Sequence, residues 1–184
     1  SGNLGNAVAC IWARSMGLPI GDVILAHNAN RTVPEFLESG ALQARPSVAT
    51  LASAMDVGNP SNLERLRAMF PEITALREAV RATSIDDAAI RDRITADHAR
   101  FGVIWCPHTA VGAETWARLP ARERDEHSWC VVATASPAKF PEIVEPLIGG
   151  KVPVPPALAE LLGRPTQRES LAATLAALRD ALLQ

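Results

Sequence analysis

The chain has 184 residues, enough for one domain with its own core, and 48% hydrophobic with 21% charged residues is an ordinary globular composition. A formal net charge of −2, with four Trp, four Phe and no Tyr, gives no basic surface and no stacking platform for nucleic acid. No apolar run approaches the roughly 18 residues of a membrane span. We therefore expect neither nucleic acid nor a membrane as a partner.

The first six residues, Ser1-Gly2-Asn3-Leu4-Gly5-Asn6, form a glycine-rich turn before an apolar run that predicts a helix from about 3 to 16. Small residues at a helix start let backbone N–H groups approach an anion, and the helix dipole favours negative charge there. The turn therefore predicts a phosphate site. A plain turn in which Asn3 or Asn6 caps the helix explains these residues equally well.

A buried strand is expected over residues 22–26, and the order of helix, short loop and strand indicates an α/β fold with a mostly parallel sheet. In such folds a phosphate turn normally follows a strand. No strand precedes Ser1, so we expect the chain to be the C-terminal piece of a longer protein.

A capping box at 32–35 predicts a short helix that Gly40 ends. Residues 41–60 have no clear regular structure, and their mixture of small, apolar and polar residues suits a packed loop near a site. Residues 61–101 read as helical and charged, with a second capping box at Ser61 and a further helix capped by Ser84. We interpret this segment as a helical insertion or flank on an α/β domain covering residues 1–150.

Two more strands are expected, at 103–106 and, most clearly, at 128–135. A helix should begin at Pro107, which places His108 in its first turn. A lone histidine there is more often structural, although an acid/base or phosphate-contacting role is open. Near the end of the second strand, Thr134 either points its hydroxyl at a ligand or is simply a β-former.

The remaining residues, 151–184, are expected to form a C-terminal helical tail whose last helix, at about 168–183, uses a leucine stripe for packing. The three cysteines are odd in number and far apart: Cys10, Cys106 and Cys130. Cys106-Pro107-His108 is not a zinc ligand set, so no metal site is predicted. We interpret the thiols as buried side chains of a cytoplasmic protein.

Five stretches, in this order, together resemble threonine synthase, a pyridoxal 5'-phosphate (PLP) enzyme. They are Ser-Gly-Asn-Leu-Gly-Asn at 1–6, Asn-Ala-Asn-Arg-Thr-Val-Pro-Glu-Phe-Leu at 28–37, Ala-Met-Asp-Val-Gly-Asn-Pro-Ser-Asn at 54–62, Pro-His-Thr-Ala-Val-Gly at 107–112 and Ala-Thr-Ala-Ser-Pro-Ala-Lys-Phe at 133–140. The resemblance is to the C-terminal part of that family and extends to about residue 165.

The resemblance implies the tryptophan-synthase-β-like PLP fold and the conversion of O-phosphohomoserine and water into threonine and phosphate. It also implies that the N-terminal half of the same protein is the partner of this chain. Residue by residue, Ser1, Gly2, Asn3, Leu4, Gly5 and Asn6 would hold the PLP phosphate, and Thr134 would hydrogen-bond the pyridine nitrogen. Polar candidates for the substrate phosphate are Ser53, Asn59, Ser61, Asn62 and His108.

The sequence departs from the family pattern at Leu4, where Phe is usual, and at Arg31 and Cys106, where acidic residues are expected. Its two lysines, Lys139 and Lys151, lie outside the Phe-Lys-Asp setting of the family's Schiff-base lysine. We therefore expect that lysine in the N-terminal half and predict that this chain alone is inactive. Two other interpretations stay open: a stand-alone phosphate- or nucleotide-binding module, and a degenerate PLP-fold scaffold.

Overall fold

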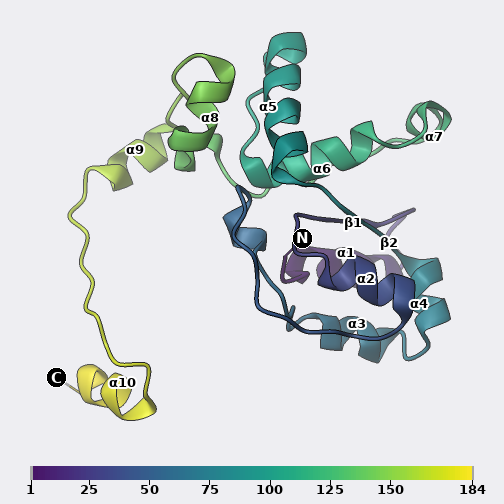
Figure 1. Ribbon diagram of the computed structural model, residues 1–184, viewed down its shortest axis with the longest axis horizontal. Coiled ribbons are helices and arrows are strands. Elements are labelled where there is room, and N and C mark those ends of the chain that lie inside the picture. Colours follow the sequence, from purple (N-terminus) through teal and green to yellow (C-terminus); the bar gives the residue numbers. More distant parts are fainter. Residues whose placement is uncertain (1, 184) are drawn as a thin grey trace. The chain divides into compact units, whose positions relative to one another are not determined.

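The computed structural model describes residues 2–183, so the prediction for Ser1 lies outside the described residues. The chain divides into two units, the first ending at Val152 and the second beginning at Pro153. In the first unit, drawn from purple to green in Figure 1, the elements are α1 (Gly5–Ser15), β1 (Ile24–His27), α2 (Thr32–Ser39), η1 (Ser53–Met55), α3 (Leu63–Met69), α4 (Ile73–Ala79), β2 (Arg81–Ser84), α5 (Asp87–Phe101), α6 (Pro107–Ala117), α7 (Ala121–Glu126), η2 (Pro137–Lys139) and α8 (Pro141–Ile148). The second unit contains α9 (Pro156–Leu162) and α10 (Leu175–Leu182).

The sheet of the described residues consists of β1 and β2, which pair in parallel with Ile24 opposite Arg81 and His27 opposite Ser84. The predicted α/β class with a parallel sheet is confirmed. The strand β2 was missed, so segment 61–101 is not wholly helical. Ser84 ends this strand, and the cap of α5 is Asp86, whose carboxylate accepts from the N–H of Ala89 at 2.9 Å.

The core of the first unit gathers one apolar face from each of α1, β1, α2, α3 and α4. Its fully buried members include Leu4, Ile11, Leu25, Leu63, Leu66 and Leu76. Burying each such side chain contributes about 1.5–3 kcal/mol, so this cluster fixes how the helices lie around the strand pair. The helix expected after Ser61 is present as α3, which buries Leu63 and Leu66.

Neither of the two later strand predictions holds within the described residues. Segments 103–106 and 128–135 have no regular secondary structure and belong to no ladder. A β-rich composition stabilises a strand only when another strand lies beside it to complete the hydrogen bonds. The helix after the first segment does begin at Pro107, as predicted, with Cys106 as its N-cap.

The two predicted capping boxes are also wrong, because other partners take their side chains. Thr32 lies inside α2 and its hydroxyl donates to the carbonyl of Gly58 at 2.9 Å, while Arg31 occupies the cap position. Ser61 bonds to Asn3 instead of capping α3. Gly40 does end α2, with a φ of 77° that favours glycine.

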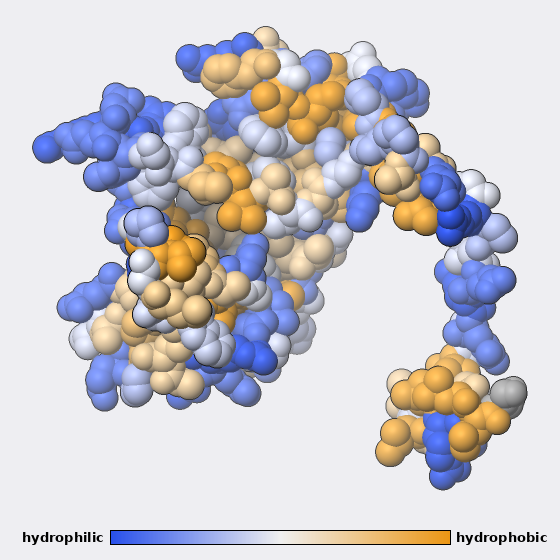
Figure 2. Space-filling model, turned by 180° about the vertical axis from the view of Figure 1, so that it is seen from behind, coloured by the Kyte–Doolittle hydropathy of each residue, from blue (hydrophilic) through white to orange (hydrophobic). Residues whose placement is uncertain are grey.

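In the second unit, α10 starts at Leu175 and not near residue 168, since Thr174 caps it by accepting from the N–H of Ala177 at 3.2 Å. The leucine stripe is exposed, with Leu175 at 83% and Leu182 at 77%, and Figure 2 shows hydrophobic side chains gathered on this end of the chain. The stripe therefore has no packing partner within the described part of the second unit. None of the helices between residues 2 and 183 is long and apolar enough to cross a membrane.

Candidate functional site

The N-terminus of α1 is built on a strained residue. Leu4 has a φ of 63°, the left-handed conformation that a branched side chain rarely adopts, and it is the one such non-glycine residue among those described. Its side chain is 1% exposed and lies in the core, and this burial offsets the strain. The turn thus anchors Leu4 inward while Gly5 and Asn6 stay exposed at the helix start.

Gly2 packs directly on the backbone of η1. A Cβ at this position would lie 2.5 Å from Met55 Cα, closer than any side chain tolerates. Only glycine lets these two backbone segments touch. Segment 54–62 therefore forms the wall behind the N-terminal turn.

Asn3 ties the same two segments together. Its side-chain oxygen accepts from the N–H of Ser61 at 2.7 Å and from the Ser61 hydroxyl at 3.1 Å, while the Asn62 side chain donates to the Asn3 carbonyl at 2.7 Å. Asn3 is therefore not the cap of α1. The same bonds occupy Ser61 and Asn62, two of the residues considered for the substrate phosphate.

The helix end that results is suited to an anion. Leu4 occupies the N-cap position and its side chain makes no capping bond, and the first turn of α1 contains no acidic residue. The helix dipole therefore places partial positive charge at this end of an 11-residue helix, with no carboxylate in the first turn to oppose it. This arrangement fits the phosphate of a cofactor such as PLP.

A network around the half-buried Asp56 carboxylate fixes the wall to the carboxyl end of β1. Asp56 accepts from the side-chain amides of Asn28 at 2.7 Å and Asn30 at 3.1 Å, and from the hydroxyl and N–H of Thr50 at 2.7 and 3.0 Å. Asn28 and Asn30 are almost fully buried. Sequence reasoning missed this network, although all but Thr50 lie in the quoted motifs 28–37 and 54–62.

His108 lies in the first turn of α6, as predicted, and joins two distant segments. Its Nε2 accepts from the N–H of Ala54 in η1 at 3.0 Å, and its ring contacts Phe140 with centroids 4.9 Å apart. The residue is 7% exposed, and its Nδ1 has no hydrogen-bond partner in the described part of the chain. These contacts give His108 a structural role between the wall behind Gly2 and the segment that carries Thr134.

Cys106 caps α6 from a buried position. Its sulfur accepts from the N–H of Thr109 at 3.3 Å and lies 3.2 Å from the Thr109 hydroxyl. Burial raises the pKa of the Cys106 thiol, but the nearby His108 ring and hydrogen bonds with Thr109 outweigh it and lower the pKa to about 7.

Thr134 lies in the irregular segment 128–135, is exposed, and makes no hydrogen bond within residues 2–183. The small residues of α6 let this segment approach, since a Cβ on Gly112 would lie 3.0 Å from a methyl group of Val131. The hydroxyl of Thr134 is thus available to a ligand. Of the other polar candidates, Ser53 and Asn59 are exposed as well.

A second histidine, which the sequence analysis did not single out, ends β1. His27 is 3% exposed and its Nε2 has no partner among the described residues. Burial lowers the pKa of His27 to about 3, so the ring is neutral at physiological pH. Its only sequence signal was its place at the end of a strand.

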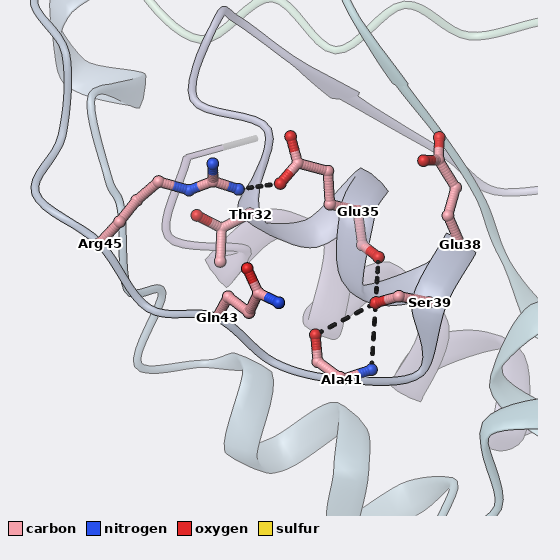
Figure 3. A pocket seen from close by; sticks show the side chains of 7 residues that line it. All are labelled: Thr32, Glu35, Glu38, Ser39, Ala41, Gln43 and Arg45. Carbon is pink, nitrogen blue, oxygen red and sulfur yellow. Dashed lines mark hydrogen bonds and ion pairs between the residues drawn. The ribbon is translucent and has the colours of Figure 1, made fainter.

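A pocket between α2 and loop 41–45 lies apart from these residues (Figure 3). Glu35 pairs with Arg45, and the Ser39 hydroxyl donates to the Glu35 carbonyl at 2.7 Å. The loop is exposed, so the predicted packed loop is correct only for its second part, around Met55. Because the charges are exposed and mutually paired, this pocket offers no site for chemistry.

Within residues 2–183 no group of three His, Cys, Asp or Glu side chains could hold a metal ion.

Residues 109–182 match the family described as "Threonine synthase, C-terminal". The threonine synthase of Serratia marcescens is 37% identical over the whole of this chain and 42% of its own length. The crystal structure of threonine synthase from Escherichia coli superposes with a TM-score of 0.87 and 33% identity, covering 100% of this chain and 42% of that one. Over its whole length this chain is similar to the C-terminal part of threonine synthases.

A PLP-bound threonine synthase from Brucella melitensis is similar too, with a TM-score of 0.78 and 27% identity over 99% of this chain and 44% of that one. The chain thus spans less than half the length of these threonine synthases and corresponds to their C-terminal part. The expected family and fold are confirmed. The alternative of a stand-alone phosphate- or nucleotide-binding module has no support in these similarities.

Proposed function

We propose that this chain is the C-terminal part of a PLP-dependent lyase that converts O-phosphohomoserine and water into threonine and phosphate. The observation that carries the proposal is the strained start of α1 at Leu4, a positive-φ turn that leads into a helix whose first turn has no acidic residue, as a phosphate site requires. The proposed reaction is taken from the relatives, which are named threonine synthase, and the Brucella melitensis structure is described as PLP-bound.

The residues present fit PLP at its two polar ends. Gly2, Asn3, Gly5 and Asn6, with Leu4 as their buried anchor, would hold the phosphate at the helix start. The exposed hydroxyl of Thr134 would pair with the ring nitrogen. PLP supplies an electron sink when bound. A neutral hydroxyl partner, in place of a carboxylate, would leave the ring nitrogen less readily protonated. The pyridine ring would then withdraw electrons less strongly.

The lysine that binds the cofactor covalently would come from outside this chain. Lys151 is 90% exposed and pairs with Glu145 at 2.7 Å, and Lys139 is exposed after Ala138. Neither side chain lies in the buried, desolvated setting that activates a lysine amine. The chain alone is therefore expected to form no threonine.

The N-terminal part of the same protein is the proposed partner. In the described residues β1 and β2 each have only one neighbouring strand, whereas parallel sheets are found with several strands and both faces covered. Segment 128–135 likewise has no strand beside it. Strands from the N-terminal part would extend the β1–β2 sheet and would pair with segment 128–135. A cytoplasmic location belongs to the same proposal, since Cys10, Cys106 and Cys130 are free thiols.

The test is an assay of the intact gene product, supplied with PLP, for phosphate and threonine release from O-phosphohomoserine. The 184-residue chain serves as the matched control. We expect the intact protein to release phosphate and threonine and to show the visible absorbance of bound PLP. The chain alone should release neither product. Absent absorbance in the intact protein would favour the degenerate scaffold, and threonine formation by the chain alone would refute its predicted inactivity.

A further inference from the structure

The carboxamide of Asn62, the last residue of the wall, lies directly at the N-terminal turn. Its Nδ2 donates to the carbonyl of Asn3 at 2.7 Å, and a Cβ on Gly5 would lie 3.8 Å from the same nitrogen. Asn62 occupies the N-cap position of α3, yet its side chain makes no capping bond there. The amide group therefore serves the turn that opens α1 and not the helix that follows Asn62.

The two neighbours of this carboxamide require the same orientation of its oxygen and nitrogen. A backbone carbonyl can only accept a hydrogen bond, so the nitrogen of Asn62 must face Asn3. On the other side the Arg65 guanidinium, which has donors only, donates to Oδ1 of Asn62. A flipped carboxamide would lose both bonds, because it would set acceptor against acceptor at Asn3 and donor against donor at Arg65.

Arg65 is placed beside Asn62 by a helix that the core holds fixed. It lies in the first turn of α3, three residues after Asn62, a spacing that brings two side chains to the same helix face. Leu63 and Leu66 of the same helix are fully buried. The Arg65 side chain is exposed and pairs with no carboxylate between residues 2 and 183, so the Asn62 oxygen has no competitor for it.

We propose that Arg65 is a positioning residue whose guanidinium holds the Asn62 carboxamide in the orientation that binds the Asn3 carbonyl, and so holds the turn in the form that receives a phosphate. The side chain of Asn3 is bonded as well, since its Oδ1 accepts from the N–H of Ser61 at 2.7 Å. Of these two bonds, the one from Asn62 reaches the backbone of the turn. Arg65 acts through Asn62 and does not itself contact the ligand.

This inference rests on the proposed function for the identity of the phosphate, which is that of PLP. The bond from Arg65 to Asn62 can be measured with no cofactor or substrate present. Failure of the intact protein to bind PLP would overturn the proposed function and leave that first measurement unaffected.

The experiment follows the Asn62 carboxamide by ¹H–¹⁵N NMR and measures the exchange of its protons with water. Arg65→Met keeps an apolar stem and removes the donors, and we expect this exchange to become faster by about 2- to 10-fold, the effect of weakening one hydrogen bond. In the intact protein the affinity for PLP should fall by about the same factor. The urea midpoint of unfolding should stay unchanged, because Arg65 is exposed.

Two further variants complete the comparison. Arg67→Met removes another exposed arginine of α3 and should change none of the three readouts. Asn62→Asp keeps an acceptor for Arg65 but sets a carboxylate oxygen against the Asn3 carbonyl. Its affinity for PLP should therefore fall at least as far as that of Arg65→Met.

Unchanged carboxamide exchange in Arg65→Met overturns the proposal. If the affinity for PLP falls in that variant all the same, Arg65 contacts the ligand directly. An affinity equal to that of the parent protein also overturns the proposal, because the orientation of Asn62 then has no effect on the phosphate. A lowered urea midpoint in Arg65→Met would assign the changes to general destabilisation and overturn the positioning role.

Discussion

Gly2 lies against the backbone of Met55, 53 positions away in sequence, and a Cβ on Gly2 would come within 2.5 Å of Met55 Cα. A methyl group cannot enter that space unless two backbone segments separate. The turn that opens α1 and the wall, segment 54–62, are therefore held rigidly together. Whatever loosens the contact alters the proposed phosphate site.

The first prediction concerns this contact. Gly2→Ala should lower the free energy of unfolding by about 1–3 kcal/mol, as overpacking against rigid backbone does. In the intact protein it should also weaken PLP binding by more than about tenfold, since about 1.4 kcal/mol corresponds to a factor of ten. Chemical denaturation and PLP titration measure the two effects. The control is Gly21→Ala, where a Cβ would meet nothing within 4 Å; equal stability of the two variants would contradict the prediction.

The second prediction concerns Asp56. Its carboxylate oxygens accept four hydrogen bonds from the described residues, so Asp56→Asn would turn an NH₂ group toward donors. We expect a loss of about 2 kcal/mol in the free energy of unfolding, because buried donors are left unpaired. Urea denaturation of Asp56→Asn against Asp92→Asn, on the exposed face of α5, is the measurement. If Asp56→Asn lowers the free energy of unfolding no more than Asp92→Asn does, the Asp56 hydrogen bonds do not stabilise segment 54–62.

The third prediction separates ligand contact from stability at Thr134. The side chain is exposed and makes no hydrogen bond in residues 2–183, so Thr134→Val should change the free energy of unfolding by no more than about 0.5 kcal/mol. The affinity of the intact protein for PLP should fall by about 2- to 10-fold, the value of one hydrogen bond. Thr134→Ser keeps the hydroxyl and should bind PLP like the parent. Equal affinities for the valine and serine variants would remove Thr134 from the site.

The fourth prediction is the pH dependence that His27 causes. Burial lowers its pKa from 6.5 to about 3, so between these values the unfolded chain binds one proton more than the folded chain. Stability therefore falls as the pH drops below 6.5, by about 1.4 kcal/mol per pH unit. His27→Gln cannot bind that proton, and its loss between pH 7 and pH 5 should be smaller than that of the parent by about 2 kcal/mol.

Denaturation curves at the two pH values, for the parent, His27→Gln and the exposed-site variant His127→Gln, give the comparison. The His127 variant should keep the full pH dependence of the parent. Parallel losses in all three proteins would mean that folded His27 titrates like an exposed histidine.

Local patterns predicted the elements whose stabilising contacts are short-range or follow a helical period. Three features were predicted correctly: the helix at residues 5–15, the end of α2 at Gly40 and the start of α6 at Pro107. Each depends on side-chain periodicity, a glycine with positive φ or a proline in a first helical turn.

Predictions failed where a distant partner decides the outcome. The polar sequence Arg81-Ala82-Thr83-Ser84 forms a strand because β1 lies beside it, whereas the β-branched segment 128–135 has no strand neighbour and joins no ladder. Thr32 and Ser61 had cap-like sequences, but Gly58 and Asn3 take their side chains. Pairings over such separations leave no mark in a local window.

The sequence by itself determined the resemblance to threonine synthase, through five ordered motifs. It also predicted a phosphate site at the glycine-rich turn, because backbone freedom and helix polarity are properties of nearby residues. Only the tertiary structure decided how the turn is held. Leu4 is strained because its side chain reaches the core, Gly2 is required because η1 passes behind it, and His108 matters because it joins Ala54 to Phe140. Each of these depends on packing between segments about 50 or more residues apart or on a shared core, which local sequence does not encode.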